Sequence, residues 1–280
     1  PSCAKLLIDA GVKRVLIATI DPDNRVSGKG MQLLKDAGIE VTLGILKKEA
    51  DESHAGFFSR INKKRPFISL KIATSLDGRI ATQTGNSKWI TGVDSRHYVH
   101  YLRATHDAVL VGRGTVEADN PSLNIRGLGD KITSPVRIVI DSNVSMDNNS
   151  FLASSAKVSP VWICHADGAN FNKISKTGAI SIPCKRNKDG IDLLDAMKNL
   201  AQNGLTRILC EGGGKLGAAL LKENLVDQLI IMQAGVAIGS EGTAAIGKMD
   251  INNLQDAPNF KMKETRKIGN DILSIWSRTT

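Results

Sequence analysis

Aromatic side chains and paired cysteines are both scarce in this sequence of 280 residues. Aromatic residues make up 4% of it, which leaves few rings on which the bases of a nucleic acid could stack. The four cysteines, Cys3, Cys164, Cys184 and Cys210, lie far apart without paired spacing, so the sequence indicates neither a disulfide framework nor a self-contained zinc site. We therefore expect a reducing, cytoplasmic location and no nucleic-acid partner.

Long apolar runs are also missing. No stretch approaches the roughly 18 consecutive apolar residues that a transmembrane helix needs. The N-terminal sequence PSCAKLLIDAGVKR has no basic segment followed by a long apolar core, unlike a secretory signal. We expect no membrane partner. The net charge of +9 is dispersed, and it suits either solubility or the attraction of anionic small molecules.

Predicted strands and helices alternate along most of the chain, which is typical of an α/β protein. A first series in residues 1–62 contains two helices, two strands and a polar helical connector. A second, longer series occupies residues 63–280 and ends in a predicted antiparallel hairpin. The first series is short for a domain that must bury its own core. We therefore expect two parts of unequal size.

The segment RILCEGGGKLGAAL, residues 207–220, predicts a strand, a glycine turn and a helix. Such junctions hold phosphates through backbone N–H groups and the positive end of the helix dipole. Gly212, Gly214 and Gly217 match the G-x-G-x-x-G pattern, but no acidic residue ends the following strand, and no Walker motif is present. The segment is either a tight structural turn or a phosphate site, and Glu211 at the end of the strand favours the phosphate site.

Two further segments contain candidate catalytic or ligand-binding residues. Lys71 lies within an apolar strand, where an unpaired ammonium is costly, so it either points into a polar pocket or lies on an edge strand with its ammonium reaching the solvent. Residues 113–126 form a predicted polar loop, and loops of this length inside compact domains are usually functional. Arg103 and Arg126 could together clamp a phosphate.

The three histidines on or near the predicted helix at 93–105 are expected on a solvated face: His97, His100 and His106.

Four segments taken together resemble the reductase domain of the bifunctional riboflavin-biosynthesis deaminase/reductases: KIATSLDGRIA, SKWITG, LRATHDAVLVGRGTVEADNPSLNIR and EGGGKLGAALL. The matching blocks cover roughly residues 66–240 in order. The resemblance implies an α/β, dihydrofolate-reductase-like fold. It also implies NADPH-dependent reduction of the ribosyl group of 5-amino-6-(5-phosphoribosylamino)uracil to ribityl. A phosphorylated pyrimidine would then be the substrate, and the family suggests a homodimer.

The resemblance also implies roles for individual residues. The positions implied for NADPH binding are Ala73, Trp89, Thr115, Asp119, Ser142, Gly213, Gly214, Lys215, Leu216, Gly217, Ala218 and Ala219. The positions implied for the substrate are Ser87, Arg103, Leu123, Arg126 and Glu211. The candidates for proton donation are Asp119, Lys71 and Glu211, preferred in that order. Relatives commonly have Pro-Thr where this chain has Gly214-Lys215, so this chain keeps a backbone N–H donor at residue 214.

The first 62 residues resemble the second half of the family's zinc-dependent deaminase domain, a cytidine-deaminase-like α/β fold. Cys3 matches the last zinc-ligand cysteine of that domain. The preceding cysteine and the His-x-Glu segment, which supply another ligand and the proton-shuttling glutamate, have no counterpart in this sequence. The resemblance therefore implies a deaminase remnant joined to a complete reductase domain, with zinc and hydrolase activity belonging only to the intact deaminase domain.

Two other functions fit the same motifs. A dihydrofolate-reductase-like enzyme acting on another pterin or pyrimidine would use the same fold, although Arg103 and Arg126 argue against an uncharged substrate. A non-catalytic nucleotide-binding module would use the glycine turn alone. Binding of the pyrimidine with and without its ribosyl 5-phosphate separates the first alternative from the leading interpretation, and consumption of NADPH with the pyrimidine would exclude the second.

We predict that this 280-residue chain has no deaminase activity, even when zinc is added, because one thiolate does not make a hydrolytic zinc site. The measurement is ammonia release from the diaminopyrimidine ribosyl phosphate, with and without zinc. Ammonia release that a chelator abolishes would contradict the prediction.

Overall fold

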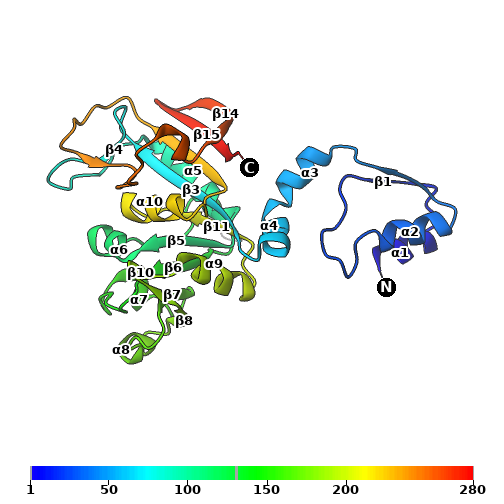
Figure 1. Cartoon of the computed structure of the whole chain (residues 1–280), viewed down its shortest axis with the longest axis horizontal. Coiled ribbons are helices and arrows are strands. Elements are labelled where there is room, and N and C mark those ends of the chain that lie inside the picture. The colour runs from blue at the N-terminus through cyan, green and yellow to red at the C-terminus, as the bar shows by residue number, and fades with distance from the viewer. Residues whose placement is uncertain (1, 130–131, 280) are drawn as a thin grey trace. The chain divides into compact units, whose positions relative to one another are not determined.

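The computed structural model describes residues 2–129 and 132–279, which fall into two compact units, Pro1–Arg65 and Pro66–Thr280 (Figure 1). The smaller unit contains α1 (Cys3–Asp9), β1 (Arg14–Ile17), α2 (Lys29–Asp36), β2 (Glu40–Leu43), α3 (Lys47–Ser53) and α4 (Ala55–Lys63). Strands β1 and β2 pair in parallel, with α2 as the crossover. A small core of Ala4, Leu34 and Ile39 joins the helices to the strands. The assignment of this unit to a deaminase remnant remains a prediction.

A mixed sheet forms the centre of the larger unit. Within the described residues it has nine strands in the order β14-β15-β12-β3-β11-β5-β6-β7-β8. The strands from β12 to β8 run parallel, whereas β15 and β14 are antiparallel and close one edge. Their bounds are β3 (Phe67–Thr74), β5 (Ala108–Gly112), β6 (Val136–Ile140), β7 (Val161–Ala166), β8 (Ile180–Cys184), β11 (Arg207–Cys210), β12 (Gln228–Gln233), β14 (Phe260–Ile268) and β15 (Asp271–Arg278).

Helices and two short antiparallel strand pairs surround this sheet. The helices are α5 (Val93–Ala104), α6 (Arg113–Asp119), α7 (Phe151–Ser154), α8 (Asn172–Ser175), α9 (Leu193–Gln202) and α10 (Gly214–Lys222), with a 3₁₀ turn η1 at Leu254–Asp256. Strand β4 (Arg79–Ala81) pairs with β13 (Thr243–Ala244), and β9 (Arg186–Asn187) pairs with β10 (Gly190–Ile191). The closing hairpin β14–β15 confirms the alternation seen in the sequence.

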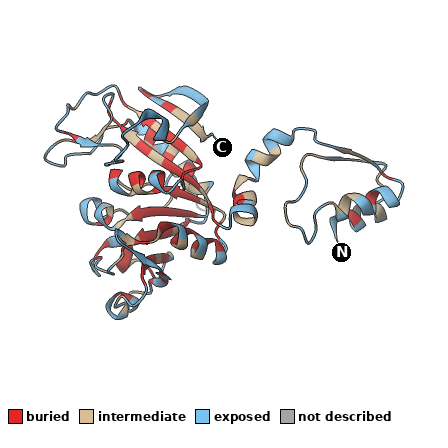
Figure 2. Ribbon diagram, viewed as in Figure 1, coloured by how far each residue is buried: buried red, intermediate tan, exposed pale blue. Residues whose placement is uncertain are grey.

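Both faces of the central strands are buried, as expected for parallel strands covered by helices on both sides (Figure 2). In β5, Ala108 and Leu110 belong to the cluster that includes Met197 of α9 and Leu220 of α10. Val109 and Val111 of the same strand belong to a different cluster, which includes Leu152 of α7. Successive residues of the strand therefore point to opposite faces, and the apolar run AVLV needs no polar face.

One expectation about local structure was wrong. Residues 113–126 were expected to form a continuous loop, but Arg113–Asp119 form helix α6 directly after β5. The helix ends at Asn120, which adopts the left-handed conformation with φ of 42°. The short helix brings Thr115 and Asp119 back over the strand ends, and only residues 120–126 continue as an irregular segment.

The carboxylate of Asp271 joins the antiparallel edge of the sheet to helix α5. This buried side chain accepts hydrogen bonds from the Gly92 N–H at 2.7 Å and from the Ser95 hydroxyl at 2.5 Å. Gly92 is the residue before α5 and has no capping side chain of its own, so Asp271 caps the helix from a distant strand.

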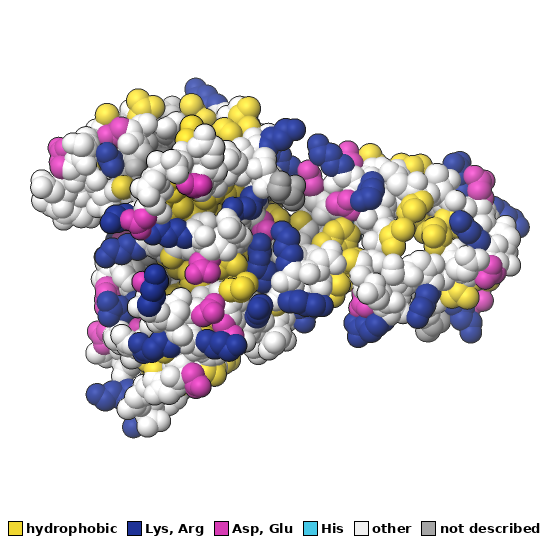
Figure 3. Space-filling view, in the orientation of Figure 1, with side chains coloured by type: hydrophobic (Ala, Val, Ile, Leu, Met, Phe, Trp, Pro, Cys, Tyr) yellow, Lys and Arg dark blue, Asp and Glu magenta, His cyan; other side chains and the backbone are white. Residues whose placement is uncertain are grey.

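Charged side chains of both signs are interspersed on the visible surface (Figure 3), in agreement with the dispersed charge of the sequence. In residues 2–129 and 132–279, none of the helices has the length and apolar character that spanning a membrane requires.

Replacement of Asp271 by alanine is expected to lower the free energy of unfolding by about 2–4 kcal/mol, because two buried hydrogen bonds to a charged group are lost. The measurement is urea unfolding of the two proteins. Asp167→Ala is the matched control, since Asp167 is exposed, and it should change stability by less than about 0.5 kcal/mol. Equal stability of Asp271→Ala and the control would contradict the capping role.

Candidate active site

Two cavities open side by side at the carboxyl edge of the parallel strands. The smaller has a volume of about 350 Å³ and the larger about 940 Å³. They share five lining residues: Ile80, Ser87, Lys88, Thr115 and Asp119. A molecule in one cavity therefore lies next to a molecule in the other, which is the arrangement needed for a reaction between two bound partners.

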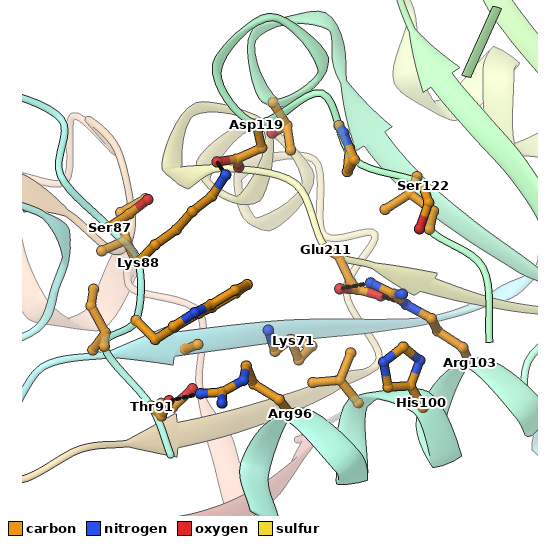
Figure 4. A pocket seen from close by; sticks show the side chains of 18 of the residues that line it. Lys71, Ser87, Lys88, Thr91, Arg96, His100, Arg103, Asp119, Ser122 and Glu211 are labelled. Carbon is orange, nitrogen blue, oxygen red and sulfur yellow. Dashed lines mark hydrogen bonds and ion pairs between the residues drawn. The ribbon is translucent and has the colours of Figure 1, made fainter. Parts of the chain in front are cut away.

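The floor of the smaller cavity carries a buried ion pair (Figure 4). Arg103 of α5 donates from Nε to Oε1 of Glu211 at 2.6 Å and from Nη2 to Oε2 at 3.0 Å. Its Nη1 donates to the carbonyl of Asn124 at 2.9 Å. The two side chains are only 11% and 10% exposed. The pair fixes Glu211 at the end of β11 and ties α5 to the segment after α6.

Lys71 of β3 lies beside this pair (Figure 4). Burial lowers the pKa of the Lys71 ammonium below its ordinary value, against the opposing attraction of Glu211. Burial by itself raises the pKa of the Glu211 carboxyl, but the charge and hydrogen bonds of Arg103, together with the charge of Lys71, lower that pKa below its ordinary value. Glu211 is therefore held ionised, whereas Lys71 releases its proton more readily than an ordinary lysine.

One face of α5 contributes three polar cavity residues at i, i+4 and i+7, Arg96, His100 and Arg103, together with the apolar Val99. The Arg96 guanidinium lies 4.7 Å from the centre of the Trp89 ring, and its Nη1 donates to the Thr91 carbonyl at 2.7 Å. Arg96 therefore fastens the segment that carries Trp89. This helical spacing was a usable signal in the sequence that the motif comparison missed.

The expectation that the histidines lie on a solvated face was wrong for two of the three. His100 accepts the backbone N–H of Arg126 at its Nδ1, at 3.2 Å, and lines the smaller cavity. Burial, followed by the charges of Arg103 and Arg126, lowers the pKa of His100 below its ordinary value. His106 contacts the hydroxyl of Ser69 at 3.0 Å and is partly buried, while His97 is exposed.

A third hollow of about 280 Å³ adjoins the first and shares Trp89, Arg96, His100 and Arg126 with it. Among the described residues its lining contains two arginines and two histidines but no carboxylate. That composition favours an anionic group.

The residues expected at the substrate all line the smaller cavity: Ser87, Arg103, Leu123, Arg126 and Glu211. Of those expected at the cofactor, Ala73 and Trp89 also line it, while Thr115 and Asp119 line both cavities. Gly213, Gly214, Lys215 and Leu216 line the larger cavity. Ser142, Gly217, Ala218 and Ala219 line neither, and Gly217 packs against Leu70 of β3. The part of the glycine turn that reaches the cavity thus ends at residue 216.

Glycines form much of the wall of the larger cavity. Because they have no side chains, a ligand there can contact the backbone directly. Gly85, Gly112, Gly114, Gly213, Gly214 and Gly247 all line it. A Cβ at Gly214 would lie 2.7 Å from the carbonyl oxygen of Ala244, and the N–H of Gly247 donates to the Gly214 carbonyl at 2.9 Å. The Gly213 N–H donates to the Thr115 hydroxyl at 3.2 Å. The turn is therefore held from both sides at the start of α10, where helix N–H groups suit a phosphate.

Metal ligands do not gather in the described residues: no group of three or more His, Cys, Asp or Glu side chains is placed to hold an ion. Cys3 is exposed in the smaller unit. Its role as a zinc ligand remains a prediction.

The fold and the two adjoining cavities define the class of the larger unit as a dihydrofolate-reductase-like reductase domain. A sequence profile of the RibD C-terminal domain matches residues 66–274. The chain is 36% identical to the riboflavin biosynthesis protein RibD of Bacillus amyloliquefaciens over 276 residues, covering 97% of this chain and 73% of that protein. It is 34% identical to RibD of Aquifex aeolicus, covering 99% of this chain and 76% of that protein.

Solved structures of RibD proteins also resemble this chain. RibD of Acinetobacter baumannii superposes with a TM-score of 0.88 at 31% identity, over 100% of this chain and 77% of that one. A Thermotoga maritima protein described as a diaminohydroxyphosphoribosylaminopyrimidine deaminase/5-amino-6-(5-phosphoribosylamino)uracil reductase superposes with a TM-score of 0.84 at 29% identity, over 100% of this chain and 75% of that one. The chain belongs to the RibD family of riboflavin biosynthesis proteins.

Replacement of Lys71 by methionine is expected to raise stability at neutral pH while it removes a site residue. The folded-state pKa of Lys71 lies below its unfolded value of about 10.4, so the wild type gains stability as pH rises through this interval. The advantage of Lys71→Met should therefore be largest near pH 7 and shrink as the pH rises. Urea unfolding at pH 7 and 9 measures it. The exposed control Lys261→Met should show no such trend, and an advantage that grows with pH would contradict the prediction.

Proposed function

We propose that the larger unit catalyses the NADPH-dependent reduction of the ribosyl group of 5-amino-6-(5-phosphoribosylamino)uracil to ribityl. The observation that carries the proposal is the pair of adjoining cavities, with the Arg103–Glu211 ion pair and the half-buried Lys71 in the floor of the smaller one. The Thermotoga maritima relative is described by this reductase activity.

The larger cavity is the proposed NADPH site. Gly213, Gly214, Lys215 and Leu216 would hold the dinucleotide's phosphates, and Thr115 and Asp119 would contact it where the two cavities meet. Ala73 and Trp89 would line the end of the NADPH site next to the smaller cavity, and Ser142 would lie at the opposite end. NADPH supplies a hydride when it is bound.

The smaller cavity is the proposed substrate site. Arg126, with Arg96 and the two histidines of the adjoining hollow, would hold the substrate's phosphate, while Ser87 and Leu123 would contact the rest of the molecule. Arg103 presents one edge of its guanidinium to Glu211, so its main task is to orient that carboxylate.

Lys71 is the proton donor that the contacts favour among the three candidates. A lysine whose pKa is lowered by burial gives up its proton more readily, and the ionised Glu211 beside it restores the charge balance. Asp119 lies at the junction of the cavities, where its Oδ1 is 4.0 Å from Nζ of Lys88. The proposal extends to a homodimer located in the cytoplasm.

The direct test is substrate-dependent oxidation of NADPH, followed at 340 nm with detection of the ribityl product. The pyrimidine without its 5-phosphate serves as the comparison substrate. Absence of turnover with the phosphorylated substrate would overturn the proposal. Equal turnover of both substrates would show that the enzyme has no binding site for the substrate's phosphate.

Replacement of Arg126 by alanine is expected to lower kcat/KM for the pyrimidine about ten- to a hundred-fold, because a charge-assisted contact of about 1.5–3 kcal/mol is lost. NADPH affinity should barely change, and Arg126→Lys should restore only part of the loss, since an ammonium cannot form the planar fork. Steady-state kinetics and fluorescence titration of NADPH measure the two effects.

Arg103→Ala is the informative contrast to Arg126→Ala. It should lower stability by about 3–5 kcal/mol as well as activity, because Glu211 would be left buried without its partner. Loss of NADPH affinity in Arg126→Ala, with pyrimidine binding intact, would show that the two anion sites are assigned the wrong way round.

A further inference from the structure

We propose that Arg137 of β6 is a positioning residue for the substrate, because its buried guanidinium holds the cavity segment Pro121–Arg126 in place. The inference rests on the proposed function, since it takes the smaller cavity as the substrate site. Arg137 lines none of the three cavities described above and belongs to none of the four motifs. Neither the sequence nor the cavity walls therefore assign it a role.

Arg137 is a buried charge without an acidic partner. It is the largest fully buried side chain among the described residues. Burial alone lowers the pKa of its guanidinium to about 10, so the group is still charged at neutral pH, and no described carboxylate forms an ion pair with it. Its Nε has no hydrogen-bond partner. A charge in such a place is costly unless other hydrogen bonds compensate it, so the oxygens around Nη1 and Nη2 decide whether it is tolerated.

Neutral oxygens from two separate segments surround the guanidinium. Nη1 donates to the Ser155 hydroxyl at 2.8 Å and to the Ser122 carbonyl at 3.3 Å. Nη2 donates to the Ser155 carbonyl at 3.3 Å and to the Ser159 carbonyl. Ser155 and Ser159 belong to the loop after α7, residues 155–160, whereas Ser122 belongs to the segment after α6. Arg137 thus fastens the segment after α6 to the loop after α7.

The segment that Arg137 contacts has an unusual backbone. Leu123 is buried in the left-handed region with φ of 56°, which is uncommon for a bulky side chain. Conformations of this kind persist only where surrounding contacts impose them, and they cluster at binding sites. The Ser122 carbonyl is part of the peptide group that joins Ser122 to Leu123. A hydrogen bond from Arg137 to this carbonyl therefore fixes the peptide group whose orientation the φ of Leu123 describes.

Two side chains of α5 hold the other half of the segment. Arg103 donates to the Asn124 carbonyl at 2.9 Å, and His100 accepts the Arg126 N–H at 3.2 Å. Among the described residues, Arg137 supplies the only hydrogen bond from a side chain to residues 121–123. The contacts from α5 therefore cannot replace it in the first half of the segment.

The effect of Arg137 should be confined to one cavity. Pro121, Ser122 and Leu123 line the smaller cavity (Figure 4 labels Ser122), and none of them lines the larger one. A shift of this wall would therefore loosen the pyrimidine and leave the dinucleotide in place. Misplacement of a substrate by about 1 Å can lower the rate about a hundred-fold, so a modest shift is enough to be measured.

The test replaces Arg137 by methionine, which removes every hydrogen bond, and by lysine, which keeps the charge. Arg137→Met should raise KM for the phosphorylated pyrimidine about ten- to a hundred-fold, with a smaller fall in kcat. NADPH affinity should barely change. Arg137→Lys should restore part of the loss, because one ammonium cannot reach all the oxygens that the planar guanidinium reaches. Steady-state kinetics, titration calorimetry of the pyrimidine and fluorescence titration of NADPH measure these effects.

His165→Phe is the matched control for the loss of a buried polar side chain. His165 lies on the neighbouring strand β7, contacts the Ser181 hydroxyl at 2.7 Å and lines neither the smaller nor the larger cavity. It should lower stability without changing KM. Ser155→Ala is a milder variant, which removes one oxygen from the guanidinium at a residue outside both cavities. It should raise KM for the pyrimidine by a smaller factor, and it decides the question if Arg137→Met does not fold.

A folded Arg137→Met with the wild-type KM for the pyrimidine would overturn the inference. Equal losses of pyrimidine and NADPH binding, an equal rise of KM in His165→Phe, or an unchanged KM in Ser155→Ala would also overturn it. Calorimetry separates the inference from the proposed function. Weaker pyrimidine binding in Arg137→Met supports the positioning role even if the wild type does not oxidise NADPH, a result that would overturn the reductase proposal alone. A wild type that binds no pyrimidine would overturn both.

Discussion

The buried contact between Arg103 and Glu211 is the interaction on which the site depends. It joins three parts of the chain: helix α5, the end of β11 and, through the Asn124 carbonyl, the segment after α6. A pair removed this far from water is stabilising only when its geometry is good and its other hydrogen bonds are satisfied. The bidentate contact supplies that geometry. The same pair keeps Glu211 ionised beside Lys71, so one interaction sets both the shape of the smaller cavity and its electrostatics.

Acidic and basic residues have different tasks in the larger unit. Several carboxylates accept backbone N–H groups and fix the ends of strands and helices, among them Asp77, Asp107, Asp141, Asp227 and Asp271. These acids are occupied by backbone N–H donors, and the cavities and their margins carry an excess of arginine, lysine and histidine. A net charge of +9 that looks dispersed along the sequence thus becomes directed toward anionic ligands where the strands end.

The two cavities differ in what lines them, and the difference follows from the elements that meet there. The larger cavity is bounded by glycine turns and by the β4–β13 pair, so backbone groups form much of its wall. The smaller cavity is bounded by one face of α5 and by the segment after α6, so it presents long charged side chains. Backbone N–H groups suit an extended nucleotide that the protein recognises mainly through its phosphates. Rigid side chains suit a small substrate whose reacting atom must be held in place.

The sequence by itself determined the α/β class, most strands, the closing hairpin and the glycine turn, because these depend on local periodicity and on short contiguous motifs. It also supplied the family, since four motifs in order are specific even when each is weak. Only the tertiary structure decided that His100 faces a cavity, that Arg103 is paired with a residue 108 positions away, and that Gly217 packs against the sheet. The physical reason is that such contacts join distant segments across strand ends, and no local pattern records which segments the sheet places side by side.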